Sequence, residues 1–466
     1  MNASCDKSLS GIDDSVLTTL RATFGERLST AAAVREQHGR GESPFRAMPP
    51  DAVVFVESTE EVCEVLKICN VHRVPAIAFG AGSSLEGHLL ATQGGVCIDL
   101  SRMDSIISVD PGDFTATVQA GVTKEALNAA LRGDGLFFPV DPGAHATLGG
   151  MVATRASGTN TVRYGSMREN VLALTVVTAD GTVVHTGTRA VKSSAGYDLT
   201  RLFVGSEGTL GVVTEVTLKL FPFPEAMSAA VVTFVDADAA VTTVIEAIQA
   251  GLPIARSEYL CANSIKAINA NSRELVLRER PTLFMEFHGS PSSLQEQTEL
   301  LREIASQHHG EDFQWADRPE DRSRLWHARH HAYFSCQLSR VGSMIIATDT
   351  CVPRSRLAES IEGATRIMAQ ASFPHMTFGH VGDGNFHVLM VIDPDSEAER
   401  EEAERLNESI VELALSLGGT CTGEHGIGFH KKAFLRREAG DAAVQLMQRI
   451  KIALDPNGIL NPDKIF

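Results

Sequence analysis

The sequence lacks any apolar run long enough to cross a bilayer. A spanning helix needs about 20 mostly apolar residues, whereas the longest candidate, Phe386 to Ile392, has the length of a strand. The amino-terminal segment has no hydrophobic stretch like that of a signal peptide and carries Asp6, Asp13 and Asp14, unlike an acid-poor transit peptide. We therefore expect a cytoplasmic protein without a transmembrane segment. Peripheral association with a membrane through a partner stays open.

Positive charge is also scarce. The chain has 41 Lys and Arg against 58 Asp and Glu, which gives a net charge of -17 at pH 7. Most of this surface would repel a polyanion, and no local basic cluster stands out, so we expect no nucleic-acid partner. Small molecules and basic proteins are the expected partners.

The cysteines contain no CxxC pair. Eight are scattered along the chain, and several lie within apolar periodic segments. This distribution predicts free, buried thiols in a reducing compartment, not a disulfide framework.

The first half of the chain is typical of an α+β domain. A length of 466 residues predicts two or three domains. From Asp51 to Pro222 short β-branched segments dominate, and Ser58 and Glu61 form a predicted capping box for a helix that ends near Asn70. Such a pattern does not fit a regular doubly wound sheet. The expected strands are 52–56, 75–79, 95–100, 105–110, 114–119, 171–177, 182–187 and 211–220.

A second pattern begins after Pro222, where strand and helix units alternate twice. This order predicts an antiparallel sheet with helices on one face. We therefore divide the chain into an N-terminal segment, an FAD-binding domain, a substrate or cap domain and a C-terminal segment that returns to the FAD-binding domain. The predicted boundaries are 1–50, 51–222, 223–420 and 421–466.

A glycine-rich loop, GAGSSLEGH, follows the strand predicted at 75–79 and spans Gly80 to His88. Such a loop can turn several backbone N–H groups toward one diphosphate. The spacing lacks the Gly-Lys-Ser/Thr of a Walker loop, and no helix is predicted directly after it, as the Rossmann fingerprint requires. Taken alone, the loop also fits a plain turn between strands.

Two further glycine-rich segments change this interpretation: Asp141 to Val171, which contains HATLGGMVATRASG, and Gly196 to Val216, which contains VGSEGTLGVV. With the first loop, they resemble the flavin domain of the vanillyl-alcohol oxidase or PCMH-type superfamily, in particular its branch of cytochrome-type D-lactate dehydrogenases and glycolate oxidase flavoproteins. The resemblance extends from about Asp51 to Phe466. It implies a PCMH-type FAD-binding domain of two α+β subdomains with an antiparallel, ferredoxin-like cap, and FAD as cofactor.

The resemblance also implies individual FAD contacts. Glycines are needed where the backbone approaches a phosphate or a ring edge closely. Tyr164 and Asn461 follow from the same comparison, with a packing aromatic and a turn asparagine as alternatives. The other implied contacts are Gly80, Ala81, Gly82, Ser83, Ser84, Pro142, Thr147, Gly149, Gly150, Ala153, Ser157, Gly158, Glu207, Gly208, Gly211 and Val212.

The segment MTFGHVGDGNFHVLMVI predicts a histidine-bearing hairpin. If Asp383 and Gly384 are the central residues of a tight turn, His380 lies opposite His387, and Asn385 projects to the same face. Directly opposed side chains have Cβ atoms about 4.5 to 5.5 Å apart, which allows both imidazoles to bind one metal ion. The alternative is a pair of structural histidines.

A third ligand is available in GTCTGEHGIG, which carries Glu424 and His425. Two histidines and a glutamate with open positions suit a divalent ion such as Zn²⁺ or Mn²⁺. The resemblance implies His380, His387 and Glu424 as ligands, Asn385 as a substrate contact and His425 as the catalytic base.

The segment LWHARHHAYF offers Arg329 for a substrate carboxylate, which its planar guanidinium can bind through two nitrogens. A surface or ion-pair role is the alternative. Family members that use D-2-hydroxyglutarate carry a Lys two residues before an Asp, where this chain has Ala347 before Asp349. This difference favours a monocarboxylate.

These features together predict FAD- and metal-dependent oxidation of a D-2-hydroxy acid, with D-lactate as the first candidate. The metal would acidify the substrate hydroxyl, His425 would take its proton, and hydride would pass to flavin N5. Without a Rossmann fingerprint we expect a non-NAD acceptor, namely cytochrome c, a quinone or an electron-transfer flavoprotein. A homodimer is among the assemblies that the sequence allows.

Several alternatives remain at this point. Within the resemblance, they are a D-2-hydroxyglutarate or glycolate dehydrogenase and a flavoprotein subunit of a larger oxidase. Outside it, they are a flavin-free metallohydrolase and a non-redox ether-lipid synthase.

Overall fold

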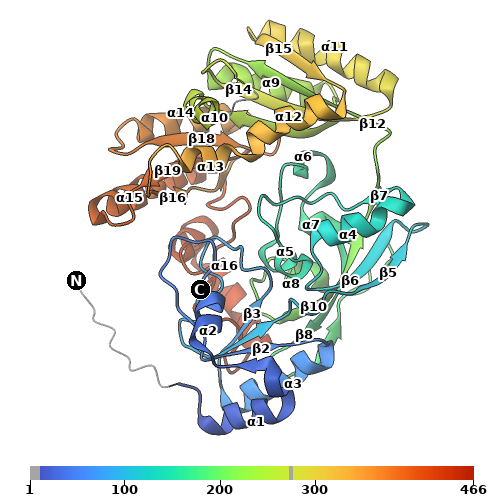
Figure 1. The fold of residues 1–466 in the computed structure, drawn as a ribbon, viewed down its shortest axis with the longest axis vertical. Coiled ribbons are helices and arrows are strands. Elements are labelled where there is room, and N and C mark those ends of the chain that lie inside the picture. The colour runs from blue at the N-terminus through green and yellow to red at the C-terminus, as the bar shows by residue number, and fades with distance from the viewer. Residues whose placement is uncertain (1–10, 272–275) are drawn as a thin grey trace.

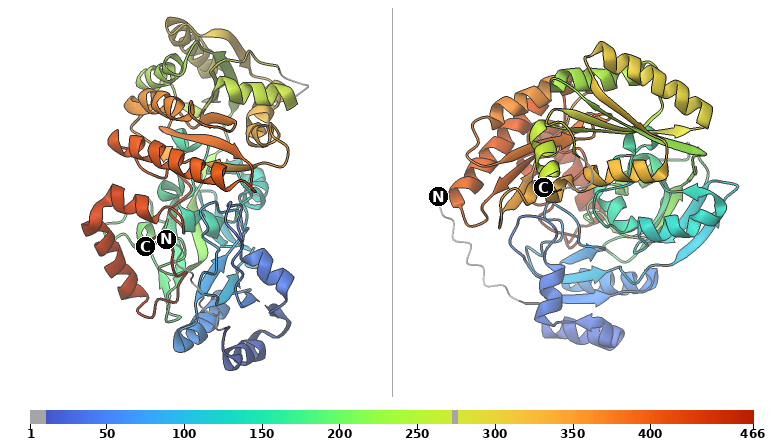
Figure 2. Two further views of the ribbon diagram at one scale, coloured as in Figure 1. Left: turned by 90° about the vertical axis from the view of Figure 1, so that its left-hand side faces the viewer. Right: turned by 45° about the horizontal axis from the view of Figure 1, so that its top comes forward.

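The computed structural model describes residues 11–271 and 276–466. Two smaller sheets lie in the lower half of Figure 1, and one large sheet with its helices lies above them. Figure 2 shows the same two halves from the side, with the C-terminal segment back beside the lower one. Cys5 and Asp6 lie outside the described residues.

The first small sheet has the strand order β1-β2-β4-β3, with β2, β4 and β3 parallel. Its strands are β1 (Leu28–Ser29), β2 (Ala52–Phe55), β3 (Ala76–Phe79) and β4 (Val96–Asp99), and its helices are α1 (Asp14–Phe24), α2 (Ala32–His38) and α3 (Thr59–His72). The capping box predicted for α3 is half formed. The Ser58 hydroxyl accepts from the Glu61 N–H, but the Glu61 carboxylate binds Arg27 and the Glu57 N–H instead of the backbone of Ser58.

The second small sheet has the order β5-β6-β10-β8-β9 and is antiparallel throughout. Its strands are β5 (Ile106–Asp110), β6 (Thr115–Gln119), β8 (Val171–Val177), β9 (Val183–His185) and β10 (Val212–Lys219), and β7 (Leu136–Phe137) pairs with β11 (Phe221–Pro222) nearby. The helices around it are α4 (Lys124–Leu131), α5 (Leu148–Thr154), α6 (Thr161–Tyr164), α7 (Met167–Asn170) and α8 (Leu199–Phe203). The two α+β subdomains are therefore confirmed.

The large sheet is antiparallel, which confirms the predicted cap. Its order is β15-β12-β14-β13-β18-β19-β16, with β17 also paired to β19. The strands are β12 (Ala226–Thr233), β13 (Ile254–Leu260), β14 (Thr282–Gly289), β15 (Glu311–Ala316), β16 (Met344–Ala347), β17 (Thr350–Cys351), β18 (His375–Gly379) and β19 (Asn385–Ile392).

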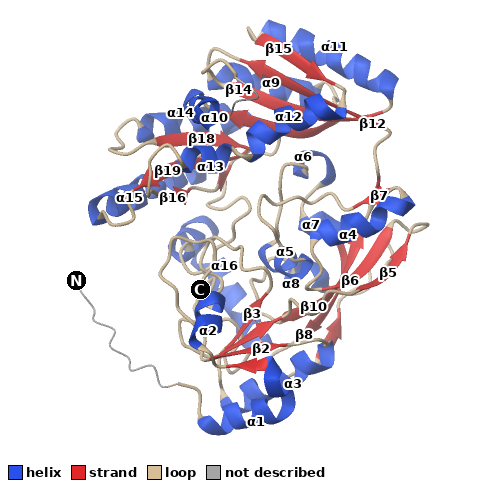
Figure 3. Cartoon of the chain, viewed as in Figure 1, coloured by secondary structure: helices blue, strands red, loops and turns tan. Residues whose placement is uncertain are grey.

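Helices cover both faces of this sheet, so the prediction of helices on one face is wrong (Figure 3). One face packs on α9 (Ala237–Gln249), α11 (Pro291–Gln307), α14 (Leu357–Met368) and α15 (Glu397–Ser416), and the other on α10 (Ala262–Asn271), α12 (Pro319–His330) and α13 (Ala332–Gln337). The physical reason lies in strands such as β19, where Val388 and Leu389 point to opposite faces and both are apolar. Each face must therefore be shielded from water.

The C-terminal part of the chain leaves the cap and packs against the first small sheet. Helix α16 (Lys432–Leu454) is broken at Gly440, and Leu460 then forms a parallel bridge with Ala76 of β3. Ile459 and Leu460 are buried in the core of that subdomain.

The cysteines agree with the prediction in the described part of the chain. All seven there are free; Cys261 and Cys351 are partly buried and the other five are buried. No helix within the described ranges combines the length and the apolar character needed to cross a membrane.

His38 ties α2 to the first sheet through a buried ion pair. Its Nε2 lies 2.8 Å from the Asp99 carboxylate and its Nδ1 lies 2.7 Å from the Val34 carbonyl, so a protonated ring can donate at both nitrogens. Burial lowers the pKa of His38, but the hydrogen bonds to Asp99 and Val34 outweigh it and raise the pKa above its usual value. The stabilisation is therefore fully present below about pH 6.5 and decreases as pH rises through the folded-state pKa.

We predict that His38→Gln destabilises the protein more at pH 6 than at pH 9. Loss of hydrogen bonds to a charged group costs about 1.5 to 3 kcal/mol, and this cost applies only while His38 is protonated. Calorimetric Tm values of wild type and variant at both pH values measure the effect. His72→Gln, on an exposed position of α3, is the matched control. Equal destabilisation at both pH values would contradict the assignment.

Candidate active site

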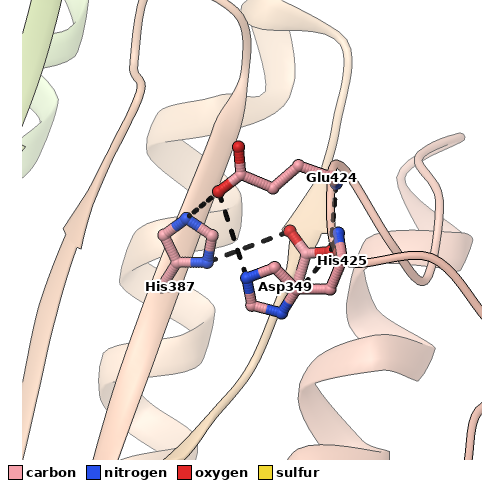
Figure 4. Close-up of side chains that lie close together, drawn as sticks. All are labelled: Asp349, His387, Glu424 and His425. Carbon is pink, nitrogen blue, oxygen red and sulfur yellow. Dashed lines mark hydrogen bonds and ion pairs between the residues drawn. The ribbon is translucent and has the colours of Figure 1, made fainter. Parts of the chain in front are cut away.

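The candidate site lies where one end of the cap sheet meets the loop that follows α15, close to the half of the chain that carries the two small sheets. Strand β13, the β18–β19 hairpin and the segment after β16 contribute side chains from the cap. The loop at residues 419–431 contributes Glu424 and His425 (Figure 4).

The β18–β19 hairpin differs from the predicted two-residue turn. Phe378, not His380, lies opposite His387, because the connection between the strands has five residues. The turn packs against the segment that follows β17. The Val352 N–H donates to the Gly384 carbonyl, and a Cβ at Gly384 would lie 2.1 Å from the Val352 oxygen. The register is shifted by two residues, and side chains alternate with a period of two. His380 therefore keeps the face of His387.

The two imidazoles of the hairpin converge on one carboxylate oxygen. The Nε2 atoms of His380 and His387 lie 3.5 and 3.2 Å from Glu424 Oε1, and the rings are nearly perpendicular, with centroids 5.6 Å apart. Each Nδ1 has its own acceptor: Glu258 Oε1 at 2.5 Å for His380 and the Thr348 carbonyl at 2.9 Å for His387. The two Nε2 atoms are thus the nitrogens available to a shared ligand.

Glu424 is ionised in this environment. Burial disfavours its charge, but His380 and His387 outweigh burial and hold the pKa of Glu424 well below its usual range. Two imidazole nitrogens and one carboxylate form a donor set that suits a divalent transition metal with open positions. The three predicted ligands are therefore together, and their chemistry fits the ion.

Asp349 belongs to the same cluster but was not predicted as a site residue. Its ligand atom lies within 4.8 Å of those of His387, Glu424 and His425. Its carboxylate already accepts four hydrogen bonds, from the Asn385 amide, the Thr422 hydroxyl and the backbone N–H groups of Glu424 and His425. We therefore assign Asp349 to holding the loop and not to binding an ion. An acidic residue at the end of the apolar segment MIIATD was the available signal.

His425 stacks on His387, with parallel rings whose centroids are 5.3 Å apart (Figure 4). Its Nδ1 faces two carboxylates, Glu86 at 3.5 Å and Asp349 at 3.9 Å, and its Nε2 lies 4.0 Å from Glu424. Burial lowers the pKa of His425, but Asp349 and Glu86 outweigh it and raise the pKa. The arrangement thus stabilises an imidazolium, as expected where a histidine accepts a proton.

Glu86 connects His425 to the glycine-rich loop, and sequence reasoning missed it. It lies within that loop, is buried, and pairs with the buried Lys431 at 2.9 Å. Burial raises the pKa of Glu86, but Lys431 and His425 outweigh it and lower the pKa well below its usual range. A charged residue between glycines was the available signal.

Two predicted FAD contacts, Ser157 and Glu207, also bind the loop that carries Glu424. The Ser157 hydroxyl donates to Glu424 Oε2 at 3.0 Å. The Glu207 carboxylate accepts from the N–H groups of Ile427 and Gly428 at 2.7 and 2.8 Å. These contacts join the half of the chain that carries the two small sheets to the loop that carries Glu424 and His425.

The three glycine-rich segments converge, as a shared cofactor requires. Gly80 lies against the Thr147 side chain, the Glu207 N–H donates to the Ala153 carbonyl, and the Asn461 amide donates to the Glu207 carbonyl. Ser84 Oγ and Asn461 Oδ1 are buried without a hydrogen-bond partner among the described residues. Unpaired buried polar atoms beside glycine-lined backbone are the features expected of a diphosphate or ring site.

The remaining predicted FAD contacts lie in the same three segments. Ala81, Gly82 and Ser83 follow β3, whereas Gly149 and Gly150 lie in the first turn of α5. The others are Pro142 and Gly158 on either side of α5, Gly208 and Gly211 in the loop before β10, and Val212 at its first position.

Three predicted residues have partners that sequence alone did not indicate. The Tyr164 hydroxyl lies 2.7 Å from Nδ1 of His288 in the cap. Arg329 uses Nε and Nη2 to bind Glu258, so those two nitrogens are already engaged. Asn385 donates to Asp349, and its Oδ1 is buried without a partner in the described chain.

We predict that Glu207→Ala loosens the Glu424 loop. Two hydrogen bonds to a charged acceptor are lost, which should raise amide hydrogen exchange at residues 422–429 by at least about tenfold. Hydrogen–deuterium exchange of the purified protein measures this change. Glu215→Ala, which removes a partly buried carboxylate from β10, is the control. Unchanged exchange at 422–429 in Glu207→Ala would show that the loop is held by other contacts.

Comparison with known families decides the identity of this fold. Residues 50–187 match the model of an FAD binding domain, and residues 223–465 match the C-terminal domain of FAD linked oxidases. The chain belongs to the FAD-linked oxidase family. It is accordingly an FAD-linked oxidoreductase, within the PCMH-type flavoprotein superfamily that the sequence resembles.

Relatives of known name cover nearly the whole chain. A protein of Danio rerio named "Probable D-lactate dehydrogenase, mitochondrial" is 49% identical over 97% of this chain and 91% of its own length. The cytochrome-type mitochondrial D-lactate dehydrogenase of Arabidopsis thaliana is 45% identical over 97% of this chain and 80% of its own. Glycolate oxidase subunit GlcD of Bacillus subtilis is 35% identical over 95% of this chain and 94% of its own length. These relatives support FAD-dependent oxidation of a hydroxy acid.

Solved structures share the fold at lower identity. p-Cresol methylhydroxylase superposes with a TM-score of 0.76 at 17% identity, over 97% of this chain and 96% of its own. An alkyldihydroxyacetonephosphate synthase has a TM-score of 0.75 at 18% identity, over 97% and 84%. At these identities the similarity defines the architecture only.

Proposed function

We propose that this protein oxidises a D-2-hydroxy acid, with D-lactate as the first candidate and pyruvate as its product. The observation that carries the proposal is the convergence of His380 Nε2, His387 Nε2 and Glu424 Oε1 beside the stacked ring of His425. Ser157 ties this cluster to the flavin-binding half of the chain through Glu424. The D-lactate dehydrogenases among the relatives support the choice of substrate.

In this proposal the chain holds two cofactors, FAD and a divalent ion. FAD, held by the glycine-rich segments around Ser84 and Thr147 together with Asn461 of the C-terminal segment, would supply the two-electron acceptor for the hydrogen that leaves Cα. A divalent ion such as Zn²⁺ or Mn²⁺, held by His380, His387 and Glu424, would acidify a nearby hydroxyl.

His425 is the residue that accepts the hydroxyl proton in this proposal. Its Nδ1 faces Glu86 and Asp349, and these carboxylates stabilise the imidazolium that forms when Nε2 is protonated. Asn385 Oδ1 is buried and unpaired in the described chain, which suits a polar contact to the substrate. While its pair with Glu258 is intact, Arg329 keeps the two N–H groups of Nη1 and one of Nη2 for a substrate carboxylate.

We propose a small monocarboxylate as the substrate. Ala347 pairs with Leu389 at the end of β16 and offers no cation for a second carboxylate. Glycolate is the second candidate, because a relative at 35% identity is a glycolate oxidase subunit.

We predict that D-lactate bleaches the flavin of the FAD-loaded protein under anaerobic conditions, and that His425→Gln slows this reduction by about 10² to 10⁴-fold with FAD still bound. Stopped-flow absorbance with D-lactate, L-lactate, glycolate and D-2-hydroxyglutarate measures substrate choice and rate. His308→Gln, whose partner is Glu246 in the cap, is the control. Near-normal reduction in His425→Gln would place the proton acceptor elsewhere.

A protein without flavin, or a flavin that no hydroxy acid reduces, would contradict the proposal itself.

We also propose a basic electron acceptor, cytochrome c in the first place. The net charge of -17 would attract such a partner, and attraction between surface charges is screened by salt. We predict that reoxidation of the reduced flavin by cytochrome c slows at least about tenfold between 10 and 300 mM salt. Reoxidation by a small neutral quinone, which lacks this attraction, is the control. A flat salt profile with cytochrome c would argue against steering by charge.

A further inference from the structure

Glu258 is a fully buried carboxylate in the middle of the cap sheet, on strand β13. It contacts one guanidinium and one imidazole. Its Oε1 lies 2.5 Å from Nδ1 of His380, and its Oε2 accepts from Nε and Nη2 of Arg329 at 2.8 and 2.5 Å. Neither the sequence pattern nor the proposed reaction assigns this residue a role.

The contact with Glu258 determines which nitrogen of His380 is free. An acceptor at Nδ1 fixes a proton there, so in the neutral ring the lone pair is on Nε2, which lies 3.5 Å from Glu424 Oε1. His387 has the same arrangement with a neutral acceptor, the Thr348 carbonyl. A carboxylate is the stronger acceptor of the two, and it makes the imidazole a better electron donor to a metal.

Arg329 compensates the charge of Glu258. A buried carboxylate without a counter-charge would be costly. The guanidinium binds Oε2 through two nitrogens and lies over the Phe378 ring, which fixes its orientation and leaves Oε1 to His380. Arg329 therefore acts on His380 through Glu258.

We propose that Glu258, held by Arg329, is a positioning residue that presents Nε2 of His380 to a divalent cation and strengthens binding of that cation. This inference rests on the proposed function, because it assumes an ion at His380, His387 and Glu424. It adds a residue 122 positions from His380 to the candidate metal site.

The first test is the metal affinity of Glu258→Gln. FAD-loaded protein is stripped of metal with a chelator, and Zn²⁺ and Mn²⁺ are titrated in competition with a chromophoric chelator. Loss of a carboxylate that orients a ligating histidine typically weakens metal binding about 10 to 100-fold, and we expect a loss in this range. Glu258→Asp is the second variant, for use if Glu258→Gln does not fold. It keeps the charge beside Arg329 but retracts it from His380, so it should also bind metal more weakly than wild type.

Glu286→Gln is the matched control. Glu286 is also a buried carboxylate on a strand of the same sheet, β14, with an arginine and a histidine as partners, Arg256 and His288. It contacts none of the three candidate ligands, so its variant should keep wild-type metal affinity. An equal loss in Glu286→Gln would show a general effect of removing buried charge and would overturn the assignment.

A double-mutant cycle with His380→Ala separates a positioning role from a merely structural one. If Glu258 acts through His380, adding Glu258→Gln to His380→Ala should weaken metal binding by no more than about twofold further. A full 10 to 100-fold loss in that background would overturn the inference.

Wild-type protein distinguishes the two proposals. If wild-type protein binds neither Zn²⁺ nor Mn²⁺, or if His380→Ala binds the ion equally well, the metal site of the proposed function fails. If wild-type protein binds one and Glu258→Gln binds equally well, only the role of Glu258 fails.

Discussion

The candidate site depends on the burial of one carboxylate, Asp349. Its oxygens accept four hydrogen bonds, and two of them come from the consecutive backbone N–H groups of Glu424 and His425. A buried carboxylate must be compensated, so this acceptor gives the loop a single favourable path. The same interaction thus places the carboxylate that faces the two hairpin histidines and the imidazole that faces Glu86. The positions of Glu424 and His425 are therefore both set by their backbone hydrogen bonds to Asp349.

The loop that Asp349 fixes is shared between the two halves of the molecule. Three side chains of the flavin-binding half, Glu86, Ser157 and Glu207, contact it near His425, Glu424 and Ile427, respectively. Glu86 lies in the glycine-rich loop itself, only two residues after Ser84, whose buried hydroxyl lacks a partner in the described chain. A ligand that orders the glycine-rich loop would therefore also order the surroundings of His425.

Local patterns in the sequence predicted the antiparallel cap and the strands of both small sheets except the two-residue β1, because β-branched runs and turn residues act over a few positions. The hairpin register was wrong by two residues, since the turn is set by its contact with Val352, far from it in sequence. The proximity of His380 and His387 nevertheless held, because an even shift preserves the face. Glu258 and Asp349 could not be assigned from sequence, since their roles depend on partners that are brought close only by the sheet.

The charges buried in the site form a balance that involves the candidate ion. The site and its surroundings contain four carboxylates, Glu86, Glu258, Asp349 and Glu424, and two permanent cations, Lys431 and Arg329. Lys431 pairs with Glu86 and Arg329 with Glu258, which leaves two negative charges for the remaining groups. Without an ion, imidazolium rings supply the compensation, and the raised pKa values of His380 and His425 agree with this. A divalent cation supplies the same two charges at once. The site thus has more carboxylates than permanent cations. Such an excess suits a site that releases protons when it binds a metal ion.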